Sequence, residues 1–209
     1  MSATELFRRY FDQCPLVAIV RGVTPDEAEA IGGAVHDAGI RIIEVPLNSP
    51  APIESIRRLA AKFGETMLVG AGTVLEAAQV AEVAGAGGRL IVAPNTNVEV
   101  IEATVAAGMV SCPGYFTPSD AFDALDAGAT ALKLFPAEGA SPAMLRAQRA
   151  VIPKDVPILV VGGVKPEAMR SWRDAGADGF GLGGGLYQAG QSAAETAAKA
   201  RAYVAGLKP

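Results

Sequence analysis

The sequence predicts an α/β fold, a (β/α)8 TIM barrel with an extra N-terminal helix, and three observations support this prediction. Short apolar runs alternate with longer alanine-rich segments of helical periodicity along all 209 residues. Prolines and capping side chains recur where those segments begin. Glycines recur where they end, so that similar units follow one another every ~20–25 residues. At this length we expect residues 1–209 to form a single domain.

Eight runs have the composition of parallel strands covered by helices, because they are apolar on both faces. They are Leu16–Val20, Arg41–Val45, Met67–Ala71, Leu90–Ala93, Met109–Cys112, Ala129–Phe135, Pro157–Val161 and Gly179–Leu182. The first dozen residues precede the first run and are expected to form the extra helix. The alternative is an open, doubly wound sheet, but no Gly-x-Gly-x-x-Gly pattern follows the first run.

The expected helices have recognisable starts and ends. Proline suits the first helical position, because its missing N–H and fixed φ are tolerated there. It stands at this position in Pro25, Pro50, Pro118, Pro142 and Pro166. The residues expected as N-caps are Thr24, Ser49, Thr117 and Ser141, with Glu27 completing a capping box. Glycine accepts the left-handed conformation that ends a helix, and it does so at Gly39, Gly108, Gly128 and Gly176.

Composition excludes several classes of partner. There are 18 basic and 22 acidic residues and no basic run, so we expect no nucleic-acid partner. No segment offers the ~18 uncharged apolar residues of a membrane span, so we expect no membrane partner. The N-terminus is too charged for a signal peptide. Cys14 and Cys112 fit reduced thiols, which predicts a cytoplasmic protein.

The single histidine restricts the chemistry. His36 is expected in the last turn of a helix, where it complements the helix dipole. One histidine cannot build a His-rich zinc or iron site, so we expect no metal. A Ser-His-Asp triad would have to use His36, which lies far from any nucleophile motif.

One lysine stands within a predicted strand. The alternation in Ala129–Phe135 places Lys133 on the face opposite Leu132 and Leu134, which predicts that it points into the barrel. The other lysines, Lys62, Lys154, Lys165, Lys199 and Lys208, fall in helices, loops or the tail. A buried lysine is costly unless paired, so Lys133 is a candidate Schiff-base amine with a lowered pKa. A solvated edge strand or a structural ion pair is the alternative.

Two further charged residues stand near strand ends, where barrels of this kind place their chemistry. Glu44 stands at the end of the second strand. We interpret it either as a group that moves protons during a reaction or as a carboxylate that only neutralises Lys133. Arg21 directly follows the first strand. It is either a residue that binds a substrate carboxylate through its guanidinium or an ordinary loop arginine.

Glycines follow the last two predicted strands, at Gly162 and Gly163 and at Gly183 and Gly184. Either pair alone fits an ordinary turn. Together, opening a short helix, they predict a phosphate site built from backbone N–H groups.

Five motifs in this order resemble the 2-keto-3-deoxy-6-phosphogluconate/6-phosphogalactonate aldolase family, over about residues 15–190. They are Ile19-Val20-Arg21-Gly22, Glu44-Val45-Pro46-Leu47-Asn48-Ser49-Pro50, Val69-Gly70-Ala71-Gly72-Thr73-Val74, Leu132-Lys133-Leu134-Phe135-Pro136 and Val161-Gly162-Gly163-Val164. The match is nearest to the phosphogalactonate branch, since the phosphogluconate branch typically has arginine at position 48 and threonine at position 161.

The resemblance implies a homotrimeric, metal-free class I aldolase without a cofactor, acting on a phosphorylated keto-deoxy sugar acid. Lys133 would form the iminium and Glu44 would move protons. Arg21 and Thr73 would hold the substrate carboxylate. The phosphate would be held by Gly162, Gly163, Gly183 and Gly184, and the rest of the pocket would be formed by Pro94, Phe135, Val161 and Asn48.

The sequence departs from the family at Gly184, where serine is common, so a hydroxyl contact to phosphate is missing. The expected substrate is 2-dehydro-3-deoxy-6-phosphogalactonate, with the C4-epimeric phosphogluconate, or both, as the alternative. A phosphosugar isomerase or epimerase on the same barrel is less compatible with a lysine centred in a strand. A barrel that binds such a ligand without turnover is the remaining alternative.

Overall fold

The computed structural model describes residues 1–208. Within them, nine parallel strands form one sheet in the order β5-β4-β3-β2-β1-β9-β8-β7-β6. The strands are β1 (Leu16–Ile19), β2 (Ile42–Pro46), β3 (Leu68–Gly72), β4 (Leu90–Val92), β5 (Val110–Cys112), β6 (Gly114–Tyr115), β7 (Leu132–Leu134), β8 (Ile158–Val161) and β9 (Gly179–Leu182).

The two ends of this sheet are joined by the chain itself. Only Pro113 separates β5 from β6, and the two strands pair with β4 and β7 respectively. Proline has no N–H to donate to a sheet, so it interrupts what is otherwise one position in the ring. The result is the predicted (β/α)8 barrel, with the fifth strand divided in two.

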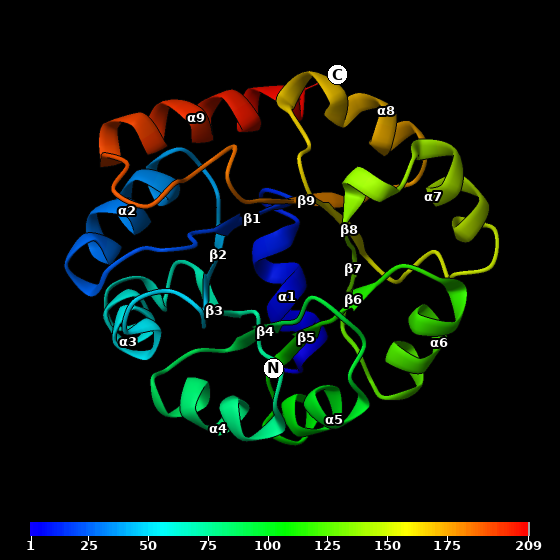
Figure 1. The fold of residues 1–209 in the computed structure, drawn as a ribbon, viewed down its shortest axis with the longest axis horizontal. Helices are drawn as coiled ribbons and strands as arrows, with labels where there is room; N and C mark the ends of the chain where they lie inside the picture. Colours follow the sequence, from blue (N-terminus) through cyan, green and yellow to red (C-terminus); the bar gives the residue numbers. More distant parts are fainter. Residues whose placement is uncertain (209) are drawn as a thin grey trace.

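Helices surround the strands (Figure 1). They are α1 (Ala3–Phe11), α2 (Pro25–Asp37), α3 (Pro52–Phe63), α4 (Ala77–Gly85), α5 (Val98–Ala106), α6 (Pro118–Asp126), α7 (Pro142–Arg149), α8 (Met169–Asp174) and α9 (Ala193–Gly206), with short 3-10 turns η1 (Ala137–Gly139) and η2 (Pro166–Ala168). Helix α1 is the predicted extra helix, and it lies across the centre of the ring. His36 is in the last turn of α2, as predicted.

Two helix starts differ from the sequence-based prediction. Helix α3 begins at Pro52 rather than Pro50, because a residue before proline is disfavoured in the helical conformation and Ala51 precedes Pro52. Ser49 is therefore no N-cap; its Oγ accepts a hydrogen bond from the N–H of Gly22 at 2.9 Å. Pro166 begins the 3-10 turn η2, and α8 starts three residues later.

The alternation of side chains creates two separate cores. Leu16, Ala18 and their equivalents pack outward against the helices. Val17, Ile19 and their equivalents fill the barrel, together with one face of α1. Phe7 of α1 is 1% exposed and stacks on Phe11 with ring centroids 4.7 Å apart. Helix α1 therefore closes one end of the barrel with aromatic side chains, and the opposite end stays open.

We predict that Phe7→Ala lowers the free energy of unfolding by about 3–5 kcal/mol, because it leaves a cavity under the barrel. Urea unfolding followed by circular dichroism measures this. Val151→Ala is the control, since Val151 is 56% exposed and should change stability by less than about 1 kcal/mol. Equal effects of the two substitutions would show that α1 does not seal the barrel.

Candidate active site

A cleft of about 700 Å³ opens where the carboxyl ends of the strands meet. It brings together the predicted site residues Arg21, Glu44, Thr73, Pro94, Lys133, Phe135, Val161, Gly162, Gly163, Gly183 and Gly184. Asn48 is the exception, because it does not line the cleft and instead contacts Arg21. The open end of the barrel is therefore the place where barrel enzymes carry their chemistry.

Lys133 points into the barrel, as the alternation predicted. Its neighbours Leu132 and Leu134 belong to the outer core, whereas Lys133 is 7% exposed and its Nζ lies 4.6 Å from the centroid of the Phe135 ring. Burial lowers the pKa of this amine, and the nearby Glu44 carboxylate opposes part of that effect. A larger fraction of the amine is thereby neutral and nucleophilic than for an exposed lysine.

Glu44 is 2% exposed on β2, and its Oε2 has no hydrogen-bond partner among the described residues. Burial raises the pKa of this carboxyl to about 7, although Lys133 and Arg21 pull it down. A group with such a pKa can both accept and donate a proton near neutral pH. The unpartnered oxygen is free for a reacting group in the cleft.

Gly72 makes room for this carboxylate. A Cβ at position 72 would overlap both carboxylate oxygens of Glu44. Sequence reasoning did not single out Gly72, although it stands beside Thr73 in the third motif; the contact across two strands is invisible in a linear pattern.

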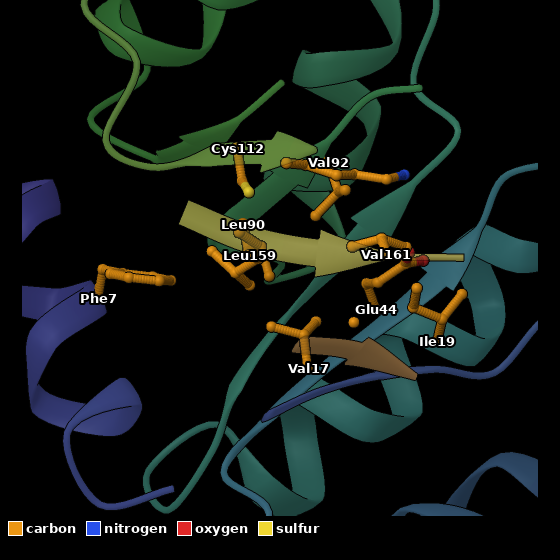
Figure 2. Close-up of a pocket in the computed structure, with 11 residues that line it drawn as sticks. Phe7, Val17, Ile19, Glu44, Leu90, Val92, Cys112, Leu159 and Val161 are labelled. Carbon is orange, nitrogen blue, oxygen red and sulfur yellow. The ribbon is translucent and has the colours of Figure 1, made fainter. Parts of the chain in front are cut away.

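Below the lysine the barrel is apolar. A small cavity of about 10 Å³ lies between the cleft and α1. Figure 2 shows Phe7 at one end of this region and Glu44 at the other, with Val17, Leu90 and Leu159 between them. Burial raises the pKa of Cys112 there to about 12, so that its thiol stays neutral. Water has no polar route to the lysine from this side, which sustains the desolvation.

Arg21 is held at the rim by its neighbours. One guanidinium nitrogen donates a hydrogen bond to Asn48 Oδ1, and the other donates to Thr73 Oγ1 at 3.4 Å. Thr73 has a φ of 55°, a left-handed conformation unusual for threonine. Ser49 holds the backbone of the adjacent Gly22. The loops after β1, β2 and β3 thus combine to fix one cation beside Glu44 and Lys133.

Two glycine pairs form the other side of the cleft. Gly162 and Gly163 follow β8, whereas Gly183 and Gly184 follow β9. None of these residues donates a backbone hydrogen bond within residues 1–208. A single helical turn follows Gly183, closed by the N–H of Tyr187 at 3.0 Å, in place of the short helix expected from the sequence. Unpaired N–H groups are suited to an anion.

The fold and the cleft define a class of protein: a (β/α)8 barrel that carries a buried amine beside a buried carboxylate at its open end. A family model described as KDPG and KHG aldolase matches residues 8–200. The chain therefore belongs to the KDPG and KHG aldolase family and is an aldolase, a carbon–carbon lyase.

Individual relatives agree with this assignment. The chain is 50% identical to the 2-dehydro-3-deoxy-6-phosphogalactonate aldolase of Escherichia coli (strain K12), over 91% of this chain and 93% of that protein. It is 30% identical to the 2-dehydro-3-deoxy-phosphogluconate aldolase of Pseudoalteromonas atlantica, over 75% and 72%. A solved structure described as native KDPGal superposes with a TM-score of 0.91 at 49% identity, covering 93% of this chain and 94% of that one.

Residues 1–208 lack the features of two other kinds of site. No helix there combines the length and apolar character required to cross a membrane. In the same residues, His, Cys, Asp and Glu side chains do not gather in threes or more around a point where a metal ion would fit.

We predict that Gly72→Ala lowers the free energy of unfolding by about 1–3 kcal/mol, because the new methyl group displaces the Glu44 carboxylate. Gly85→Ala is the control: it makes the same change at the end of α4, where a Cβ meets nothing within 4 Å, and should be neutral or slightly stabilising. Urea unfolding compares the two. Equal stability of the two variants would contradict the contact between Gly72 and Glu44.

Proposed function

We propose that this protein is a class I aldolase that cleaves 2-dehydro-3-deoxy-6-phosphogalactonate into pyruvate and glyceraldehyde 3-phosphate. The observation that carries the proposal is the burial of Lys133 beside Glu44 in the open end of the barrel. The substrate is inferred from the 50% identical Escherichia coli relative, whose name states it.

The reaction begins at the neutral Lys133 amine, which attacks the C2 ketone of the substrate. Glu44 donates a proton to the departing hydroxyl, so that water leaves and an iminium forms. Glu44, now a carboxylate, removes the proton of the C4 hydroxyl. The C3–C4 bond breaks, its electron pair enters the iminium, and the aldehyde and a lysine-bound enamine result. Glu44 returns its proton to C3 of the enamine, and hydrolysis releases pyruvate and regenerates the amine.

The pKa shifts support these roles. A lysine with an ordinary pKa of about 10.4 is almost fully protonated at neutral pH and cannot attack a ketone. An exposed glutamate with a pKa of about 4.3 is a poor proton donor there. Burial lowers the pKa of Lys133, so the amine loses its proton more readily, and it raises the pKa of Glu44 to about 7, so the carboxyl can hold or release a proton near neutral pH.

The remaining cleft residues fit the two ends of the substrate. Arg21 and Thr73 are suited to the pyruvyl carboxylate, because a guanidinium and a hydroxyl meet there. The four glycines are suited to the phosphate at the other end. Pro94, Phe135 and Val161 form walls between the two, and Asn48 orients Arg21 through its hydrogen bond.

We also propose that the protein is a cytoplasmic homotrimer. Apolar side chains in the loop before α4 and on α5 and α6 support an interface on this side of the barrel. These side chains are all more than a third exposed: Leu75, Val98, Val105 and Phe122. The two buried, unbridged cysteines suit a reducing compartment.

Borohydride reduction in the presence of pyruvate tests the lysine chemistry. We predict a stable adduct on Lys133, found by mass spectrometry of proteolytic peptides, and its absence in Lys133→Ala. The matched control Lys154→Ala removes an exposed lysine far from the cleft and should keep the adduct. An adduct on another lysine of the wild-type protein would overturn the proposal.

Steady-state kinetics on the two C4 epimers tests the substrate. We expect kcat/KM to be at least about tenfold higher for the galactonate, and Lys133→Ala to reduce cleavage by a factor of about 1,000 or more. A preference for the gluconate epimer would contradict the proposed substrate and place the protein in the phosphogluconate branch, while leaving the proposed Schiff-base mechanism on Lys133 unaffected.

A further inference from the structure

The strongest unexplained feature of the cleft is an acidic side chain on one of the two glycine pairs. Glu138 belongs to η1, the turn that follows the lysine strand β7. Its carboxylate lies against Gly162 and Gly163: a Cβ at Gly162 would overlap Oε2, and one at Gly163 would lie 3.1 Å from Oε1. Sequence reasoning overlooked Glu138, because nothing in the linear pattern connects η1 with the loop after β8.

The second glycine pair is open. A Cβ added at Gly183 or Gly184 would meet nothing within 4 Å. Both pairs line one cleft and both present N–H groups that donate no backbone hydrogen bond within residues 1–208. An anion entering this space would therefore find one pair exposed and the other covered by a negative charge.

The carboxylate is free to leave this position. Glu138 is exposed, and within residues 1–208 it takes part in no hydrogen bond and no ion pair. The turn beneath it is held by its own backbone hydrogen bonds, from the N–H of Gly139 to the carbonyl of Pro136 at 3.0 Å and from the N–H of Ala140 to the carbonyl of Ala137 at 3.1 Å. Rotation of the Glu138 side chain alone can thus uncover the glycines without a change in the loop.

We propose that Glu138 acts as an anionic gate on this subsite, which takes the phosphate group of the substrate and of the aldehyde product. This inference rests on the proposed function for the identity of the ligand. A phosphate bound at Gly162 and Gly163 would need the space that the Glu138 carboxylate fills, and the two anions repel each other. The phosphate therefore displaces Glu138 toward solvent, and the side chain returns when the product leaves. The gate weakens phosphate binding and thereby favours release of the phosphorylated product.

Binding of inorganic phosphate, measured by isothermal titration calorimetry, tests the gate without depending on turnover. We expect Glu138→Gln and Glu138→Ala to bind phosphate about tenfold more tightly than wild type, equivalent to about 1.4 kcal/mol. The matched control Glu65→Gln makes the same charge change at an exposed position in the turn after α3 and should leave the affinity unchanged within about twofold.

Two variants separate relief of repulsion from a new contact. If only Glu138→Gln binds more tightly, the added amide is donating to phosphate and the gate is wrong. Unchanged or weaker binding by both variants also overturns it, as does the absence of phosphate binding in wild type and variants alike.

The gate and the proposed function fail in different ways. In the same variants, we expect KM for the phosphorylated substrate to fall about five- to tenfold, whereas borohydride trapping of pyruvate on Lys133 stays at the wild-type level. Trapping with unchanged phosphate affinity rejects the gate alone. Tighter phosphate binding without any pyruvate adduct rejects the aldolase mechanism and keeps the anion gate.

Discussion

The burial of two ionisable side chains, Lys133 and Glu44, inside an otherwise apolar barrel is the constraint on which the rest of this structure depends. Moving an ammonium and a carboxylate out of water costs several kcal/mol for each, and their mutual attraction recovers only part of that cost. Because burial disfavours the charged form of each group, it lowers the pKa of Lys133 and raises the pKa of Glu44. The same burial that costs stability therefore makes the amine easier to deprotonate and supplies a carboxyl group that exchanges protons near pH 7.

Several distant features serve this pair. Aromatic side chains of α1 seal the far end of the barrel, so that the site is wet on one side only. Gly72 leaves the space that the Glu44 carboxylate occupies. The loops after β1, β2 and β3 hold Arg21 at the rim, where it lowers the pKa of Glu44 without being buried beside it. Stability and chemistry are thus coupled, because most groups that position the pair also complete the core.

The sequence predicted those features that depend on residues close together in the chain. Alternation placed Lys133 inside the barrel, and apolar runs located the strands to within a few residues. It failed where contacts between distant segments decide the outcome. Ser49 looked like a helix cap but holds Gly22 instead, and Pro52 shifts the helix start past Pro50. Gly72 and Glu138 escaped notice for the same reason, since their importance comes from side chains on other strands and turns.

Burial lowers the pKa of the Lys133 amine, and a direct titration of this amine is the most direct test of that effect. NMR of the protein labelled with 13C,15N-lysine follows the Cε and Nζ signals with pH, and the Lys133 signals are those absent from Lys133→Met. We expect a midpoint clearly below the ordinary value of about 10.4. A midpoint at or above that value would mean that burial does not lower the pKa of Lys133 and that the amine stays charged, which contradicts its proposed role as the nucleophile.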